Sequence, residues 1–263
     1  MFAVTPGLAV AHRPRSFVRV AGPDAADYLQ RMVSNDIEAL PVRGSCEALL
    51  LTPKARVLAP LVVWRRAEED FLLLTEPDLG ERVLAHLLRM RLRARAEVEL
   101  EQHSSVVVFG GADGIPDREY GEPAVEVLDT DLEPTVGEQE LELKRIRAGT
   151  PRYGREVDDR VLPAEAGLVE RAVSFTKGCY PGQEPVARLH NRGHVNRGLR
   201  VLRIDAGEPP SYDAEISFEG KAVGRVTSAV VDPDGGVLAL GYVRVEVPAA
   251  AELTVAGAGA RLL

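Results

Sequence analysis

The residues best suited to chemistry lie in one short run, K-G-C-Y-P-G-Q-E, at positions 177–184. The run holds Cys179, one of only two cysteines, between Gly178 and Gly182. Glycine adopts backbone conformations closed to other residues and the intervening proline fixes a dihedral, so the run is typical of a shaped turn. A thiol on such a turn is partly exposed, and Lys177 would favour its reactive thiolate form. The alternative is a loop that merely turns the chain, with Cys179 as a small buried filler.

The segment after this run is locally cationic. Four arginines and two histidines lie within about twenty residues of Cys179, although the net charge of the chain is -8. Such a patch suits an anionic ligand that carries carboxylate or phosphate groups. His190 and His194 have the spacing of paired metal ligands on a helix. However, Pro185 and Gly193 disfavour a helix there, and no fourth ligand is evident, so the sequence does not predict a permanent metal site.

The motif, followed by V-A-R and R-G-x-x-x-R, resembles the YgfZ-type folate-binding proteins, of the same superfamily as the aminomethyltransferase of the glycine cleavage system. The resemblance implies tetrahydrofolate or a derivative as cofactor, and a cytoplasmic role in iron–sulfur cluster assembly or repair that supports tRNA modification. It implies that the partners are the iron–sulfur assembly machinery or client iron–sulfur enzymes. Cys179 would be the working thiol and Lys177 its activating group. The other motif residues expected to shape the site are Gly178, Tyr180, Gly182, Gln183, Glu184, Arg188, Arg192 and Arg197.

Two further segments carry the same resemblance. Y-G-E-P-A-V-E, at positions 120–126, resembles the strand whose last glutamate binds the pterin ring, which implies Glu126 as the pterin acceptor. A carboxylate that accepts two N–H bonds suits a 2-amino-pyrimidinone edge. R-I-R-A-G, at positions 145–149, resembles the end of a folate-binding helix and implies that Arg145 contacts the folate. The alternatives are an outward strand charge for Glu126 and a solvated surface arginine for Arg145.

One departure from the superfamily limits the expected chemistry. Ala59 and Pro60 stand where the aminomethyltransferases carry paired aspartates, one of which is needed for transfer. Neither residue accepts a proton or orients an amine. An accessory folate-binding role is therefore expected ahead of aminomethyl or one-carbon transfer. A scaffold that binds assembly partners and no small molecule is a third hypothesis.

Composition sets the broader limits. The chain has 263 residues, 45% hydrophobic and 27% charged, as in ordinary globular proteins. Its acidic balance argues against general nucleic-acid coating. No apolar run is long enough to span a bilayer, and the N-terminus lacks a signal-peptide pattern. Two cysteines do not make a disulfide scaffold and fit a reducing cytoplasm.

Hydrophobic patterning predicts the α+β fold class. Residues 17–100 show the succession strand, helix, two strands, strand, helix, strand, which predicts one inserted α+β domain. Residues 1–16 and 101–197 are expected to form a discontinuous α+β domain that carries the cysteine motif. Residues 198–263 contain short strands separated by turn residues, which predicts a small β-barrel domain. The resemblance implies that two ferredoxin-like domains and the barrel surround a central cavity.

Overall fold

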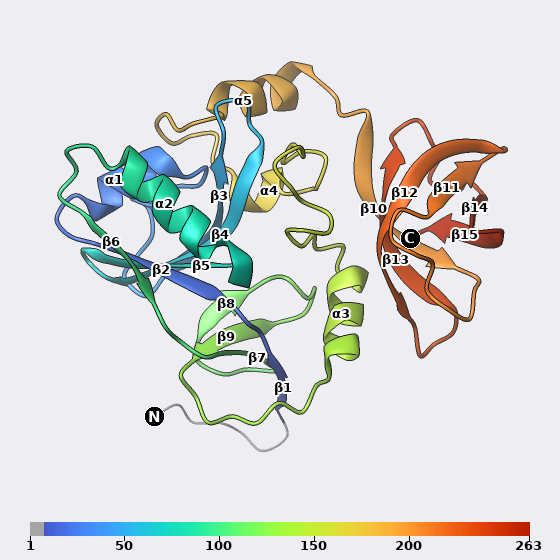
Figure 1. Ribbon diagram of the computed structural model, residues 1–263, viewed down its shortest axis with the longest axis horizontal. Coiled ribbons are helices and arrows are strands. Elements are labelled where there is room, and N and C mark those ends of the chain that lie inside the picture. Colours follow the sequence, from blue (N-terminus) through green and yellow to red (C-terminus); the bar gives the residue numbers. More distant parts are fainter. Residues whose placement is uncertain (1–7) are drawn as a thin grey trace.

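A five-stranded antiparallel sheet occupies the first third of the computed structural model, which describes residues 8–263 (Figure 1). Helices α1 (Ala25–Met32) and α2 (Gly80–Met90), the latter preceded by a short 3-10 turn at Pro77–Leu79, share one core with this sheet. Alternate strand residues such as Val18 and Val20 enter that core, as expected for a strand with one face toward helices. The sheet order is β3 (Ser45–Leu51), β4 (Val57–Ala67), β5 (Asp70–Thr75), β2 (Ser16–Ala21), β6 (Glu97–Glu101).

A second sheet combines the start of the described chain with its middle. Its order is β1 (Ala9–His12), β7 (Ser105–Phe109), β9 (Ala124–Leu128), β8 (Ile115–Asp117). The chain leaves this sheet after β1, builds the five-stranded sheet, and returns at β7. Within residues 1–16, expected to belong to the discontinuous domain, residues 9–12 form strand β1, while residues 1–7 lie outside the described residues.

The C-terminal strands form a closed barrel, which Figure 1 shows in orange and red beside helix α3 (Glu138–Arg147). Leu143 and Ile146 of α3 pack against Leu238 and Leu240 of the barrel. The barrel order is β10 (Arg197–Ile204), β13 (Val237–Arg244), β12 (Lys221–Val231), β11 (Glu215–Phe218), β14 (Leu253–Val255), β15 (Ala258–Leu262). The predicted fold class, two sheets with helices and a C-terminal barrel, is confirmed.

The segment between α3 and the barrel contains two helices, α4 (Val169–Ala172) and α5 (Gln183–Arg192). Helix α5 corrects the expectation that Pro185 disfavours a helix. Gly182 is the N-cap, so Pro185 falls in the first turn, where a backbone N–H has no acceptor within the helix. The helix ends at Arg192 with Gly193 as its C-cap, which leaves His194 beyond it. No helix in residues 8–263 has the length and apolar composition needed to cross a bilayer.

Candidate functional site

The cysteine motif forms the turn that opens α5. Gly182 has φ of 86°, in the left-handed region that favours glycine. A Cβ atom at this position would lie 2.7 Å from the carbonyl oxygen of Thr52, at the tip of the β3–β4 hairpin. The motif backbone therefore rests directly on the hairpin backbone. Cys179 is exposed on this turn, and a Cβ at the neighbouring Gly178 would meet no atom within 4 Å.

Lys177 ties the motif to the end of helix α1. Its Nζ atom donates hydrogen bonds to the carbonyl oxygens of Gln30 at 2.5 Å, Val33 at 2.6 Å and Asn35 at 2.8 Å. These carbonyls lie at and beyond the last turn of α1, where helical partners run out. Burial lowers the pKa of Lys177 to about 8. All three ammonium donors are used in this way, and activation of Cys179 by Lys177 stays a prediction.

Tyr180 anchors the turn from the other side. Its ring is buried in a cluster with Leu49, Leu51 and Val57, and it lies 5.2 Å from the Nζ atom of Lys177. Burial raises the pKa of its hydroxyl to about 12. Tyr180 and Lys177 thus hold the turn from within, while the thiol between them points to the surface.

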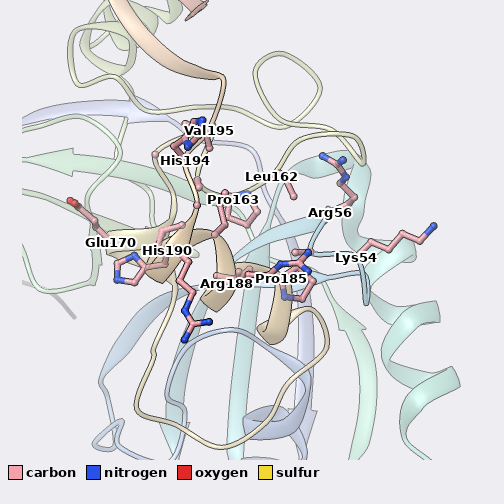
Figure 2. A pocket seen from close by; sticks show the side chains of 18 residues that line it. Lys54, Arg56, Leu162, Pro163, Glu170, Pro185, Arg188, His190, His194 and Val195 are labelled. Carbon is pink, nitrogen blue, oxygen red and sulfur yellow. The ribbon is translucent and has the colours of Figure 1, made fainter. Parts of the chain in front are cut away.

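Helix α5 forms one wall of a cavity of about 850 Å³, here called the α5 cavity (Figure 2). The hairpin tip at residues 53–56 and the loop at residues 162–170 contribute other walls. Among the predicted motif residues, Arg188 and Arg192 line the cavity, together with His190 and His194. Lys54 and Arg56 add two further cations that sequence reading missed, because they lie more than 120 positions before α5.

Other predicted residues fall outside this cavity. Arg197 forms an ion pair with Glu165 at 3.0 Å, and its guanidinium lies 4.8 Å from the ring centroid of Tyr242. It thus joins the barrel to the preceding loop. Gln183 and Glu184 begin α5, and Cys179 is not among the residues that line the cavity. Cys179 is therefore exposed at the surface and does not line the α5 cavity.

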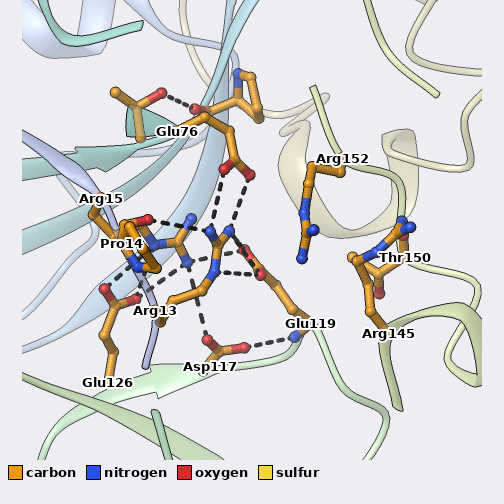
Figure 3. A network of polar contacts seen from close by, with 12 residues as sticks. Arg13, Pro14, Arg15, Glu76, Asp117, Glu119, Glu126, Arg145, Thr150 and Arg152 are labelled. Atoms are coloured by element: carbon orange, nitrogen blue, oxygen red, sulfur yellow. Dashed lines mark hydrogen bonds and ion pairs between the residues drawn. The ribbon is translucent and has the colours of Figure 1, made fainter. Parts of the chain in front are cut away.

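Glu126 lies in a buried charge network between the two sheets (Figure 3). Its carboxylate accepts hydrogen bonds from Arg15 at 3.2 Å and from Ser105 at 2.5 Å. Arg13 and Arg15 also bind Glu119, at 3.0 and 2.9 Å. The hollow beside this network, lined by Glu126 and Pro60, is only about 50 Å³, much smaller than the central cavity that the resemblance implies.

Asp117 is a buried carboxylate of this network, and its Oδ2 atom lies 4.0 Å from the Nη2 atom of Arg15. Its Oδ1 atom accepts a hydrogen bond from the backbone N–H of Glu119, whereas its buried Oδ2 atom has no hydrogen-bond partner within residues 8–263. Burial and the nearby Glu119 carboxylate raise the pKa of Asp117 to about 7. Burial opposes ionisation of Glu119 too, but Arg15 and Arg13 hold the pKa of Glu119 well below its usual range.

Arg145 is buried between α3 and the barrel, not solvated at the surface. Its guanidinium donates to Glu142 twice, at 2.9 and 2.6 Å, to Glu156 at 3.0 Å, to the carbonyl oxygen of Thr150 and to the hydroxyl of Ser228. A guanidinium has five N–H donors, and five are used. Contact with folate, which stays a prediction, would require one of these bonds to break.

Ala59 and Pro60, which the resemblance aligns with paired aspartates, lie on strand β4. Ala59 is buried in the core of the five-stranded sheet, and Pro60 lines the small central hollow. The Pro60 carbonyl accepts a hydrogen bond from the Thr75 hydroxyl at 2.8 Å. No side chain at either position supplies a proton acceptor. Among residues 8–263, no group of three or more His, Cys, Asp or Glu side chains is arranged to hold a metal ion.

The fold is that of the glycine cleavage T-proteins. The structure matches the crystal structure of the glycine cleavage system aminomethyltransferase T from Bartonella henselae with a TM-score of 0.83, covering 97% of this chain and 84% of that one. The two sequences are 20% identical, so this likeness concerns the fold alone. Residues 15–110 match the model of the GCVT N-terminal domain.

Two relatives carry names that describe a role and not only a fold. The mitochondrial iron–sulfur cluster assembly factor IBA57 homolog of Pyricularia oryzae is 29% identical over 255 residues, which cover 86% of this chain and 64% of the relative. The tRNA-modifying protein YgfZ of Serratia proteamaculans is 25% identical over 268 residues, covering 84% of this chain and 79% of the relative. The resemblance inferred from the cysteine motif is confirmed.

The two motif glycines should respond differently to alanine. Gly182→Ala places a methyl group against the Thr52 carbonyl at positive φ, and we expect it to lower the free energy of unfolding by about 2–4 kcal/mol. Gly178→Ala is the matched control and should change it by less than about 0.5 kcal/mol. Urea denaturation measures both, and equal effects would contradict the packing described for Gly182.

Lys177→Met should destabilise the fold because it leaves three carbonyl oxygens without their charged donor. We expect a loss of about 2–4 kcal/mol in the free energy of unfolding. Lys54→Met, at an exposed lysine on the hairpin tip, is the control and should have little effect. A loss no larger than that of the control would show that Lys177 does not hold the motif.

Asp117→Asn should stabilise the protein in a pH-dependent manner. The folded-state pKa of about 7 lies above the unfolded value near 4, so ionisation of Asp117 weakens the fold as pH rises between these values. The stability advantage of the variant should therefore grow from pH 5 to pH 7 and then level off at about 2–4 kcal/mol. Thermal and urea unfolding at several pH values measure it. Asp113→Asn, at an exposed aspartate, should give a flat difference.

Proposed function

We propose that the protein is a folate-binding accessory factor that supports assembly or repair of iron–sulfur clusters, and thereby tRNA modification, with Cys179 as its working thiol. Two kinds of relative favour this role: one is named as an iron–sulfur cluster assembly factor and the other as a tRNA-modifying protein. The cluster, or iron destined for one, would be cargo rather than a resident group. The iron–sulfur assembly machinery or the client iron–sulfur enzymes would be the partners of this protein.

The observation that carries the proposal is the exposure of Cys179 on a firmly held turn. Its thiol projects between buried Lys177 and buried Tyr180, and the space beside Gly178 is open. An exposed thiol is accessible to iron or to a partner's thiol, whereas a buried one is inert. The alternative of a small buried filler is wrong for Cys179, because its side chain is exposed.

Folate does not fit the residues around Glu126 as they stand. The Glu126 carboxylate already accepts hydrogen bonds from Arg15 and Ser105, and the adjoining hollow of about 50 Å³ is far below the roughly 300–1,000 Å³ of ordinary ligand sites. No step of the proposed role is therefore derived through a pterin at this position. Folate binding is proposed from the resemblance alone.

Aminomethyl or one-carbon transfer is the second candidate function. The T-protein fold favours it, but the side chains of Ala59 and Pro60 cannot act as a proton acceptor. Incubation with tetrahydrofolate and an aminomethyl donor should yield no methylene-tetrahydrofolate, and turnover above the uncatalysed rate would overturn the accessory role. A scaffold without a small-molecule ligand is the third candidate, and saturable folate binding would exclude it.

Cys179→Ala should abolish support of client enzymes while folate binding persists, because the thiol acts on iron or sulfur chemistry and not on the ligand. Support is measured as the activity of an iron–sulfur tRNA-modifying enzyme in cells that lack this protein and are supplied with each variant. Folate binding is measured by calorimetric titration of the purified variant with tetrahydrofolate. Cys46→Ala, at the half-buried second cysteine, is the matched control and should retain support. Full support by Cys179→Ala would refute a working thiol.

A further inference from the structure

The α5 cavity has the size and lining of a site for a small amphipathic molecule. Its volume of about 850 Å³ lies within the range of ordinary ligand pockets. Apolar side chains contributed by three segments form much of its surface, among them Ala55, Leu162, Val186 and Leu189. An apolar ring system would therefore be buried there in preference to water.

The charged groups of the cavity are nearly all of one sign. Lys54, Arg56, Arg188 and Arg192 line it, and Glu170 is the single acidic residue among the lining groups. Figure 2 shows Lys54 and Arg56 on the hairpin tip and Arg188 on α5, and Arg192 lines the cavity from the end of the same helix. Within residues 8–263 none of the four forms an ion pair.

This lack of ion pairs contrasts with the rest of the molecule. Arg13, Arg15 and Arg145 are each held by two or more carboxylates. The chain as a whole has an excess of acidic residues, with a net charge of -8, so acidic partners are not scarce. Four cations facing one cavity without such partners provide a site for the carboxylates or phosphates of a ligand.

The central hollow offers the opposite arrangement. It measures about 50 Å³, and Arg15, which lines it, is already paired with the carboxylates of Glu119 and Glu126. An anionic molecule would have to open several buried ion pairs to enter, which costs several kcal/mol. The α5 cavity is therefore larger than the central hollow, and its cations lack the carboxylate partners that Arg15 has in the hollow.

We propose that the α5 cavity, and not the hollow at Glu126, receives the ligand of this protein: a molecule of folate size with an apolar ring body and two or more carboxylates. Tetrahydrofolate as the occupant rests on the proposed function. The cavity as a site for an amphipathic anion rests on its own lining. In this arrangement the rings lie on the apolar surface while Arg188 and Arg192 pair with the carboxylates.

The test uses the full chain and two probes. Tetrahydrofolate is titrated by calorimetry, and anilinonaphthalene sulfonate, a fluorescent aromatic anion, is titrated by its emission. Arg188→Gln/Arg192→Gln removes two exposed cations of the cavity while retaining residues with good helix propensity. Arg43→Gln/Arg93→Gln makes the same change in net charge at exposed arginines outside the cavity. Glu126→Gln, with its fold checked by circular dichroism, reports on the central hollow.

The expected result is that Arg188→Gln/Arg192→Gln weakens binding of both probes at least tenfold, while the control double variant and Glu126→Gln stay within threefold of the parent. Folate binding that depends on Glu126 and not on the two arginines would overturn the assignment and leave the proposed function intact. If tetrahydrofolate does not bind but the sulfonate still requires Arg188 and Arg192, folate binding fails and the anion site stands. If Arg188→Gln/Arg192→Gln binds both probes as tightly as the parent protein does, the α5 cavity is not the anion site. Both double variants alter only exposed positions and should fold. The comparison between them therefore tests the α5 cavity even if Glu126→Gln does not fold.

Discussion

Arg13 and Arg15 provide the interaction on which the arrangement of the two sheets depends. They lie on the link between β1 and β2, where the chain passes from one sheet to the other, and their side chains are 5% and 4% exposed. Arg13 reaches Glu76, which follows β5, and Glu119, which lies between β8 and β9. These ion pairs link Arg13 and Arg15 to four carboxylates, those of Glu76, Asp117, Glu119 and Glu126. Removing one partner of a buried ion pair is costly, so the network ties together the segments that carry these residues.

This network leaves little open space between the two sheets. The same architecture of two sheets and a barrel is present, yet the central hollow is filled by side chains from four segments. The larger open volume lies instead beside α5, between that helix, the hairpin tip and residues 162–170. Fold similarity therefore locates the elements but not the binding site, because the site depends on a few side chains.

Local patterns predicted much of the fold. The succession of strand and helix patterns in residues 17–100 predicted the first sheet with its two helices, turn-separated strands predicted the barrel, and the motif glycines predicted a shaped turn. Helix α5 was missed because a proline was weighed by its type and not by its place in a first turn. The signal that could have found α5 is Gly182 as an N-cap, followed by Glu184 in that first turn.

The candidate site was less accessible from the sequence than the fold. Cys179, Arg188 and Arg192 stand close together in the chain, so their type and spacing were readable. The contacts of Lys177 with the end of α1 and the contributions of Lys54 and Arg56 to the cavity join positions more than 100 residues apart. Such pairings follow from tertiary packing, which no local pattern encodes. The division into one discontinuous, one inserted and one C-terminal domain stays a prediction.

The contact of Gly182 with Thr52 restrains the turn that carries Cys179. Main chain rests on main chain there, with no flexible side chain between them, so the turn that bears Cys179 is seated on the end of two long paired strands. Because residue 182 has no side chain, the turn packs closely against the hairpin and restrains the position of the exposed Cys179.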